Sequence, residues 1–477
     1  MRTAEDYRAA LKSKKQKLYA NGERVDDVTS HPRYRKVLAS HALHYTLAHN
    51  PEHSSLLTTK SYLSDKTIYR WSSLTKTMED VINYARLKRF GYENTGTCVS
   101  ATCVGFCAFN SLWHATWKMD RELGTNYHER LKNYILTAEA EGYMIAGGLT
   151  DAKGNRRLKA SEQAEKDTFI RIVDRKPDGI VVRGIKCMVA GAVAADEIFI
   201  MPGAGYREDE KEYAVACVIP RNIEGLTMIE NRRVNDVRDL EDGWDNPVPY
   251  ANNAAYLILD NVYVPNERVF MAGEAKYSMD FISYYTANYR STQGGCVAGQ
   301  GSIMVGAAVN IARANGLSSN VMRDKLMQMV LNNETTWSMG IGAIAMGKLL
   351  PSGVWMSDPL LAHSTKVQIA TLPYETKRLC QEVAGGIGET GCFPSSRDFP
   401  MMEKYFAAGS TGRARARTAR LIEWLTVGSG IPGCLHGGGS PDGARLVMRG
   451  SYPFESFAKK AAELAGVTDE IAEPPKK

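Results

Sequence analysis

The sequence predicts an α+β protein of three domains, with a helical domain at each end and a β domain between them. At 477 residues the chain is longer than one hydrophobic core usually supports. Apolar residues recur at helical spacing up to about residue 141 and again after about residue 280, and short β-branched and aromatic runs fill the stretch between. We therefore expect an N-terminal helical domain at 1–143, a middle β domain at 144–272 and a C-terminal helical domain at 273–477.

Composition and charge exclude several classes of protein. With 44% hydrophobic and 23% charged residues, the chain has the composition of a globular protein and not of a disordered or fibrous one. The net charge of +6 comes without a block of like charges, so we expect no nucleic-acid partner. The nine cysteines are too scattered for a secreted disulfide framework. Since no apolar signal segment or long apolar run is present, we expect no membrane partner and a cytoplasmic location.

Helices are expected through most of the N-terminal domain. The pattern Thr3-Ala-Glu-Asp6 resembles a capping box at the start of a first helix. Near-helical spacing of apolar residues predicts a helix over 75–87, directly before a group of cysteines. Two more helices are predicted over 103–121 and 127–141.

Strands are expected in the middle domain and helices after it. Residues 168–186 predict two strands joined by the turn Lys176-Pro-Asp-Gly179. Further strands are predicted over 197–201, 213–219 and 256–265. The clearest helices of the C-terminal domain are predicted over 301–314, 324–349 and 374–386.

Cysteines are concentrated in one short stretch of the chain. Cys98, Cys103 and Cys107 lie within ten residues, and Cys296 is a distant fourth candidate. Soft thiolate ligands from separate helices are what an iron–sulfur cluster or a zinc ion requires. Free cysteine also fills helical cores as a small apolar residue, and spacing alone favours that interpretation. Both interpretations stay open on the spacing.

Motifs along nearly the whole chain resemble the 4-hydroxybutyryl-CoA dehydratase/vinylacetyl-CoA isomerase family. This family shares an acyl-CoA dehydrogenase-like fold with the two-component 4-hydroxyphenylacetate 3-monooxygenases. The resemblance implies an N-terminal helical domain, a middle β-barrel domain and a C-terminal helical bundle. The segments that carry it are Thr58-Thr-Lys-Ser61, Cys103-Val-Gly-Phe-Cys-Ala-Phe-Asn110, Gly124-Thr-Asn-Tyr-His128, Gly147-Gly-Leu-Thr-Asp151, Asp178-Gly-Ile-Val-Val-Arg-Gly-Ile-Lys186, Asp260-Asn-Val-Tyr-Val-Pro265 and Gly294-Gly-Cys296.

The resemblance implies FAD bound between the middle and C-terminal domains. Leu149, Thr150 and the strand 182–190, with Lys186 and Ala190, would line the flavin. Gly385-Gly386 would contact it from a neighbouring subunit, which implies a homodimer or homotetramer. Taken alone, this glycine pair is more typical of a helix C-cap.

The resemblance also implies a [4Fe–4S] cluster. Cys98, Cys103 and Cys296 would be its thiolate ligands, whereas Cys107 occupies a position that is not a ligand in the family. The first cysteine pair is one residue wider here than in the family.

Several family residues are replaced in this chain. Tyr289 stands where the family has a histidine that ligates iron, Gln293 replaces a tyrosine, Val297 a lysine and Ala190 a flavin-side threonine. The family's acidic residues have no counterpart near 252–256 or 432–436. These losses put ordinary dehydratase chemistry in question.

The expected function is elimination of water or double-bond migration on an acyl substrate activated as a CoA thioester or on a carrier. We expect Tyr289 to face the pocket as a base or as an oxygen ligand to iron, with Gln293 one turn further along its helix. His128 is a candidate acid or base in the pocket, and a structural role for it stays open. The alternative is a two-component monooxygenase driven by reduced flavin, although its substrate-holding Arg and Tyr are replaced by Asn94-Thr-Gly-Thr97.

Overall fold

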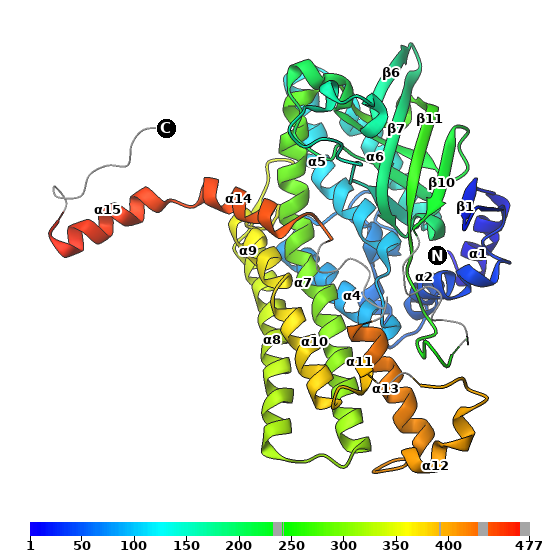
Figure 1. Cartoon of the computed structure of the whole chain (residues 1–477). Helices are drawn as coiled ribbons and strands as arrows, with labels where there is room; N and C mark the ends of the chain where they lie inside the picture. Colours follow the sequence, from blue (N-terminus) through cyan, green and yellow to red (C-terminus); the bar gives the residue numbers. More distant parts are fainter. Residues whose placement is uncertain (232–240, 242, 391–392, 428–436, 468–477) are drawn as a thin grey trace.

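The computed structural model describes residues 1–231, 241, 243–390, 393–427 and 437–467 (Figure 1). N-terminal helices and the β region lie at one end of the molecule, and the long C-terminal helices form the other end (Figure 1). The last two helices form an arm that starts against helix Pro359–Ile369 and projects from this body (Figure 1). The helical, β and helical order expected from the sequence is confirmed.

Four of the described N-terminal helices form where the sequence predicts them, and two more, over 35–48 and 54–57, were not predicted individually. They are α1 (Ala4–Ser13), α2 (Arg35–Ala48), α3 (Ser54–Leu57), α4 (Met78–Thr95), α5 (Val104–Leu123) and α6 (Tyr127–Glu141). The capping box at Thr3 is confirmed, and Thr77 starts α4 with a second one. Such boxes satisfy amide groups that have no partner inside the helix.

The β region consists of two separate sheets, and its described strands do not close into one barrel. The six-stranded sheet has the order β2 (Glu23–Val25), β1 (Leu18–Ala20), β10 (Leu226–Glu230), β11 (Ala254–Pro265), β7 (Gly179–Ala190) and β6 (Arg171–Lys176). The four-stranded sheet has the order β12 (Val269–Ala272), β9 (Val215–Pro220), β8 (Glu197–Ile200) and β5 (Ile145–Gly148). The barrel implied by the family resemblance is therefore not seen in this arrangement.

The N-terminal part of the chain is not purely helical, which corrects the expectation from the sequence. Strand β1 pairs in parallel with β10, more than 200 residues away in the chain. A second hairpin joins β3 (Thr58–Lys60) to β4 (Thr67–Tyr69). Strands β1, β3 and β4 are each three residues long, which is too short for an alternating pattern of apolar and polar residues to stand out in the sequence.

The C-terminal bundle is built around one 40-residue helix, α7 (Ala275–Ala314). Its length and apolar composition would also suit a membrane span, but 61% of its most apolar window is buried inside the protein. Packed around it are α8 (Asn320–Ala345), α9 (Pro359–Ile369), α10 (Leu372–Val383) and α13 (Gly412–Thr426). The remaining elements are α11 (Ile387–Thr390), α12 (Glu403–Phe406), α14 (Pro441–Ser451), α15 (Phe454–Ala465) and the hairpin of β13 (Lys348–Leu349) with β14 (Trp355–Met356).

Two glycines let α7 approach α4 at backbone distance. A Cβ atom at Gly295 would lie 2.2 Å from the carbonyl oxygen of Ala85, and one at Gly299 would lie 2.5 Å from that of Arg89. Any side chain at either position would force the two helices apart. The cysteine that follows Gly295 is thereby held beside α4 and the segment that connects it to α5.

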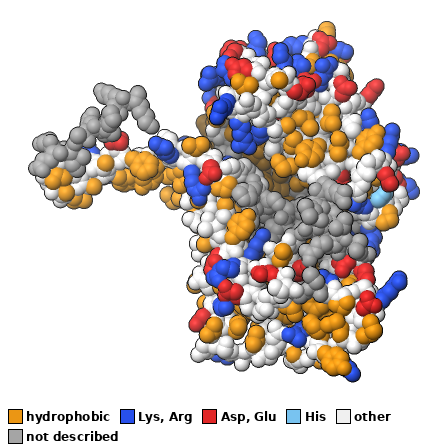
Figure 2. Space-filling view, viewed as in Figure 1, with side chains coloured by type: hydrophobic (Ala, Val, Ile, Leu, Met, Phe, Trp, Pro, Cys, Tyr) orange, Lys and Arg blue, Asp and Glu red, His pale blue; other side chains and the backbone are white. Residues whose placement is uncertain are grey.

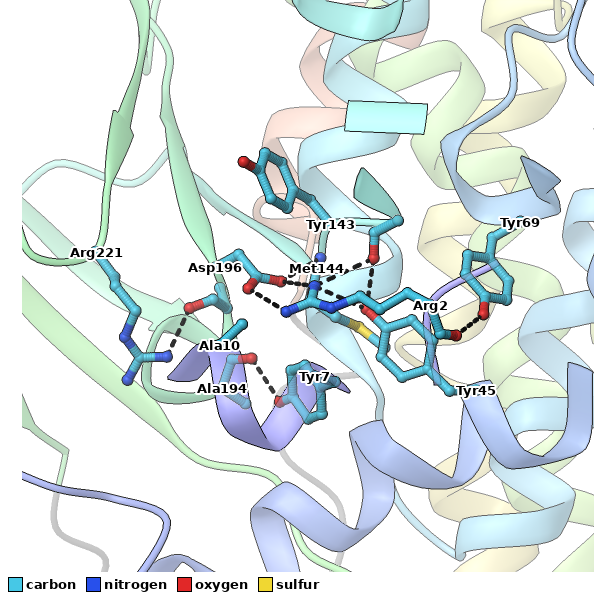
Figure 3. Close-up of polar contacts among 12 residues, drawn as sticks. Arg2, Tyr7, Ala10, Tyr45, Tyr69, Tyr143, Met144, Ala194, Asp196 and Arg221 are labelled. Carbon is cyan, nitrogen blue, oxygen red and sulfur yellow. Dashed lines mark hydrogen bonds and ion pairs between the residues drawn. The ribbon is translucent and has the colours of Figure 1, made fainter. Parts of the chain in front are cut away.

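The N-terminus is tied to the β region by a buried polar network (Figure 3). Arg2 forms a two-pronged ion pair with Asp196, at 2.8 and 2.9 Å. The Asp196 carboxylate also accepts a hydrogen bond from the backbone N–H of Met144, just before β5, with 2.9 Å between nitrogen and oxygen. Tyr7 donates to the carbonyl oxygen of Ala194 at 2.6 Å, so α1 is anchored to the loop that precedes β8.

A buried carboxyl group on α6 makes stability depend on pH. Glu139 is 5% exposed and accepts a hydrogen bond from the Ser61 hydroxyl at 2.6 Å. Burial raises its pKa from 4.5 to about 7, in spite of that hydrogen bond. As the pH rises through this window, the unfolded state loses its proton before the native state does, so native stability falls.

Glu139→Gln should therefore change the pH dependence of unfolding. We expect little difference in Tm from the wild type near about pH 5, and a higher Tm for the variant at about pH 8, because the amide needs no charge in the core. Thermal unfolding of both proteins at the two pH values measures this. Equal Tm values at about pH 8 would show that the Glu139 carboxyl is not held protonated.

Candidate active site

One cavity of about 770 Å³ lies where the N-terminal helices, the β region and α7 meet. Its volume is within the usual range for cofactor and ligand pockets. None of its described lining residues is Asp or Glu. Among them are His44, Tyr84, Lys88, Gly91, Cys98, Cys103, Leu149, Thr150, Lys153, Ala190, Tyr285, Tyr289, Gln293, Cys296 and the glycine segment 437–439.

Three of the four candidate cysteines open on this cavity. Cys98 and Cys103 lie in the connection between α4 and α5, and Cys296 lies on α7. Cys107 is buried on α5 behind them. Among the described residues, no three His, Cys, Asp or Glu side chains converge tightly enough to hold a single metal ion. A [4Fe–4S] cluster differs from such a site, because each iron takes its own thiolate.

Lys88 places an ammonium group beside these thiols. Its Nζ atom donates to the Thr292 hydroxyl at 2.7 Å and lies 3.6 Å from the Cys107 sulfur. It also lies 4.8 Å and 4.9 Å from the ring centres of Tyr84 and Tyr289. Within the described part of the chain it forms no ion pair with Asp or Glu.

The charge of Lys88 changes the chemistry of its neighbours. Burial acts to raise the pKa of Cys107, but a hydrogen bond with Cys103 and the Lys88 ammonium lower it to about 6. Hydrogen bonding with Cys107 and burial raise the pKa of the Cys103 thiol well above its usual value. Lys88 therefore favours negative charge on this side of the cavity.

The tyrosines of the cavity are proton donors. Burial raises the pKa values of Tyr84, Tyr285 and Tyr289 well above 10. The rings of Tyr285 and Tyr289 stack with their centres 5.3 Å apart. Tyr289 faces the cavity beside the cysteines, as the sequence predicts. Because its hydroxyl keeps its proton at neutral pH, we expect it to act as an acid and not as the tyrosinate base considered from the sequence.

Gln293 lies one turn beyond Tyr289 and holds the glycine segment in place. Its amide nitrogen donates to the carbonyl oxygen of Gly437 at 3.0 Å, and Lys366 donates to the same oxygen at 2.6 Å. A Cβ atom at Gly438 would lie 2.5 Å from the Tyr289 ring. The segment therefore packs on Tyr289. The missing acidic residue near 432–436 lies outside the described residues.

The residues expected to line a flavin divide into two groups. Leu149, Thr150 and Ala190 do line the cavity. Lys186 does not, because its ammonium is buried against Asp151 at 2.5 Å and the carbonyl oxygen of Leu149 at 3.1 Å. This corrects the prediction of a direct contact: Lys186 supports the loop from behind.

The histidine predicted from the sequence lies outside the cavity. The Nδ1 atom of His128 is 3.0 Å from the Thr116 hydroxyl, and its ring packs edge-on against Trp113. This placement corrects the expectation that His128 lines the substrate pocket. His44 on α2 lines the cavity instead and was missed from the sequence.

Gly385 and Gly386 end α10 in the left-handed conformation, with φ of +70° and +73°. Gly386 N–H donates to Gln381 and Gly385 N–H to Glu382, which is a Schellman C-cap. Neither glycine lines the cavity of its own chain, and a Cβ atom on either would meet open space. A contact with the flavin of a neighbouring subunit stays a prediction.

Lys88 was also missed, although the sequence contains a signal for it. Val81, Tyr84 and Lys88 share one face of α4, and the first two are buried. A lysine on an otherwise apolar helix face is uncommon and indicates a polar partner inside the fold. His44 gave no comparable signal, because its helix has buried residues around most of its circumference.

Comparison with known proteins shows a full-length likeness. The 4-hydroxyphenylacetate 3-hydroxylase N-terminal family matches residues 3–271, and the C-terminal family matches 278–466. The chain is 33% identical to the 4-hydroxybutyryl-CoA dehydratase/vinylacetyl-CoA-Delta-isomerase of Clostridium aminobutyricum, over 98% of this chain and 99% of that protein.

Solved structures agree with this likeness. An oxygen-tolerant archaeal 4-hydroxybutyryl-CoA dehydratase from N. maritimus matches with a TM-score of 0.94 at 32% identity, covering 100% of this chain and 97% of that one. The oxygenase component of 4-hydroxyphenylacetate 3-monooxygenase, complexed with FAD, matches with a TM-score of 0.86 at 20% identity, covering 97% and 98%. The second match shows a shared fold. The chain belongs to the 4-hydroxybutyryl-CoA dehydratase/vinylacetyl-CoA isomerase family, within the wider 4-hydroxyphenylacetate 3-hydroxylase family.

Proposed function

We propose that the protein is an FAD-dependent enzyme that eliminates water from, or moves a double bond in, an acyl group carried as a CoA thioester. The observation that carries this proposal is the single cavity shared by the three candidate cluster thiols, Tyr289 and the loop of Leu149 and Thr150. Full-length identity of 33% to a dehydratase that acts on 4-hydroxybutyryl-CoA supports the substrate class.

The cavity suits FAD by size and by lining. Leu149, Thr150 and Ala190 would hold the flavin from the side of the β region. Gly385 and Gly386 of a second copy would approach it closely, because glycine leaves backbone N–H groups accessible. When bound, FAD supplies an acceptor for electrons or hydride next to the acyl chain.

Cys98, Cys103 and Cys296 would hold a [4Fe–4S] cluster. Their donor chemistry fits, because thiolates are the ligands that iron–sulfur clusters take. These three thiols line one cavity, together with that of Cys187. A cluster iron with an open position supplies a Lewis acid for a hydroxyl or carbonyl oxygen.

The side chains of the cavity have separate roles in this proposal. Tyr289 donates a proton or hydrogen bond to the oxygen that leaves or becomes negative. Lys88 stabilises negative charge, since it has no carboxylate partner among the described residues. Gln293 fixes the glycine segment that packs on Tyr289. The apolar remainder of the lining keeps water away from the reacting atoms.

We propose a homodimer or homotetramer, because the projecting arm exposes a row of apolar side chains (Figure 2). These side chains are Leu446, Val447, Tyr452, Phe454, Phe457 and Leu464. Apolar patches of this kind are usually covered by a partner.

We also propose a cytoplasmic location. The described cysteines are all free, as is usual for proteins of the reducing cytoplasm.

Turnover of 4-hydroxybutyryl-CoA by the anaerobically purified protein tests the proposed function. We expect a product that has lost one water, formed without O2 and without a flavin reductase. Mass spectrometry of the acyl-CoA products measures this. A strict requirement for O2 and a reductase, with an oxygen atom added to the substrate, would instead support the monooxygenase alternative.

Tyr289→Phe is the variant for the same assay. Removal of one hydroxyl should lower kcat by on the order of 10²-fold, the usual contribution of a proton donor, while Tm changes little. The control is Tyr285→Phe, which removes the neighbouring stacked hydroxyl in the same cavity. Undiminished turnover in Tyr289→Phe would remove Tyr289 from the mechanism.

Gly386→Leu tests the flavin site shared between subunits. Leucine at φ +73° strains the backbone wherever it stands, so Gly124→Leu, at φ +69° and also at a helix end with open space around it, is the matched control. We expect similar losses of Tm in both variants but loss of flavin only in Gly386→Leu. Flavin absorbance per chain, with light scattering for oligomeric state, measures this. A monomeric Gly386→Leu protein with full flavin would contradict a shared site.

A further inference from the structure

His44 is a neutral histidine with a fixed tautomer. It is 2% exposed, and its Nδ1 atom lies 3.3 Å from the carbonyl oxygen of Ser40. A carbonyl oxygen can only accept, so Nδ1 carries the hydrogen and Nε2 keeps its lone pair. Burial, with a smaller effect of His41, lowers the pKa of His44 to about 4, which keeps the ring uncharged at neutral pH.

Nε2 of His44 packs against Gly91 of α4 at the edge of the cavity. A Cβ atom at Gly91 would lie 2.8 Å from Nε2, which is closer than real side chains pack. His44 and Gly91 both line the cavity. Among the described residues Nε2 has no hydrogen-bond partner, and it is not fully buried, whereas Nε2 of His41 is.

The other ionisable groups of the cavity are poorly suited to accept a proton. Tyr84, Tyr285 and Tyr289 hold theirs, and none of the described lining residues is a carboxylate. Lys88 is a cation, and Cys98, Cys103 and Cys296 are the proposed cluster ligands. Cys187 also lines the cavity, but burial raises the pKa of its thiol, so it keeps its proton. Burial lowers the pKa of Lys153, which makes Lys153 a second candidate base.

We propose that Nε2 of His44 is the base that removes the proton next to the thioester carbonyl. In this step the α-carbon–hydrogen bond breaks, and its electron pair stays on the substrate as an enolate whose charge is shared with the thioester oxygen. The proton forms an N–H bond at Nε2, and the ring becomes an imidazolium. The ammonium of Lys88 on the same cavity favours the enolate, and the proton later returns to the acyl chain or leaves with the hydroxyl as water.

This role of His44 rests on the proposed function. His44 would do the work of the family histidine whose position Tyr289 occupies in this chain. The chain offers a closely matched control in His41, on the same helix. His41 is also buried, its Nδ1 lies 2.9 Å from the carbonyl oxygen of Val37, and burial lowers its pKa to about 4. It does not line the cavity. The two residues differ in access to substrate and in little else.

Removal of the α-proton can be measured separately from complete turnover. The assay follows exchange of the α-hydrogen of 4-hydroxybutyryl-CoA for deuterium in D2O by mass spectrometry. With the anaerobically purified holoenzyme we expect His44→Gln to slow exchange by on the order of 10²-fold or more, and His41→Gln to leave it near the wild-type rate. Flavin content and Tm should be unchanged in His44→Gln. In His44→Ala, added imidazole should restore part of the exchange.

Wild-type exchange in His44→Gln, or loss of exchange in Lys153→Gln alone, would overturn the assignment to His44 and leave the proposed function intact. A wild-type holoenzyme that neither exchanges the α-hydrogen nor dehydrates the thioester would overturn the proposed function, and the role of His44 with it. If His44→Gln fails to fold, absence of imidazole rescue in a folded His44→Ala protein would overturn the assignment.

Discussion

The close approach of α4 and α7 is the constraint on which the candidate site depends. Gly295 and Gly299 allow the backbones of the two helices to touch, and each stands within three residues of Cys296. This contact places Cys296, Tyr289 and Gln293 opposite Lys88 and the cysteine segment after α4. A larger residue at either glycine would widen the gap and separate the thiols from one another. The glycines that allow α4 and α7 to pack closely therefore also determine which side chains meet in the cavity.

The cavity formed in this way suits substrates that become negative during reaction. Its tyrosines are proton donors, Lys88 contributes positive charge, and no described lining residue is a carboxylate. Donors that are already oriented in an apolar surrounding stabilise developing charge more strongly than water does. A thioester that loses its α-proton, or a hydroxyl that leaves, develops such charge.

The sequence was sufficient for the helical and β order, for the caps at Thr3 and for the family, because periodicity, capping pairs and motifs are local signals. It was not sufficient for the pairing of β1 with β10 or for the burial of Lys186 against Asp151, which depend on contacts between distant segments. The positions of His128 and His44 also depend on contacts between distant segments. Both are histidines on helices, and only the tertiary structure decides which one reaches the cavity.

Quantifying iron, acid-labile sulfide and flavin after anaerobic purification tests the proposed cluster and flavin most directly. A [4Fe–4S] cluster and one FAD predict about four irons, about four sulfides and about one flavin per chain. Cys103→Ser and Cys296→Ser should each lose the iron, whereas Cys217→Ser, a buried thiol on β9, should retain it. An iron-free, yellow wild-type protein, or iron that survives both site substitutions, would contradict the account and leave these cysteines as core residues.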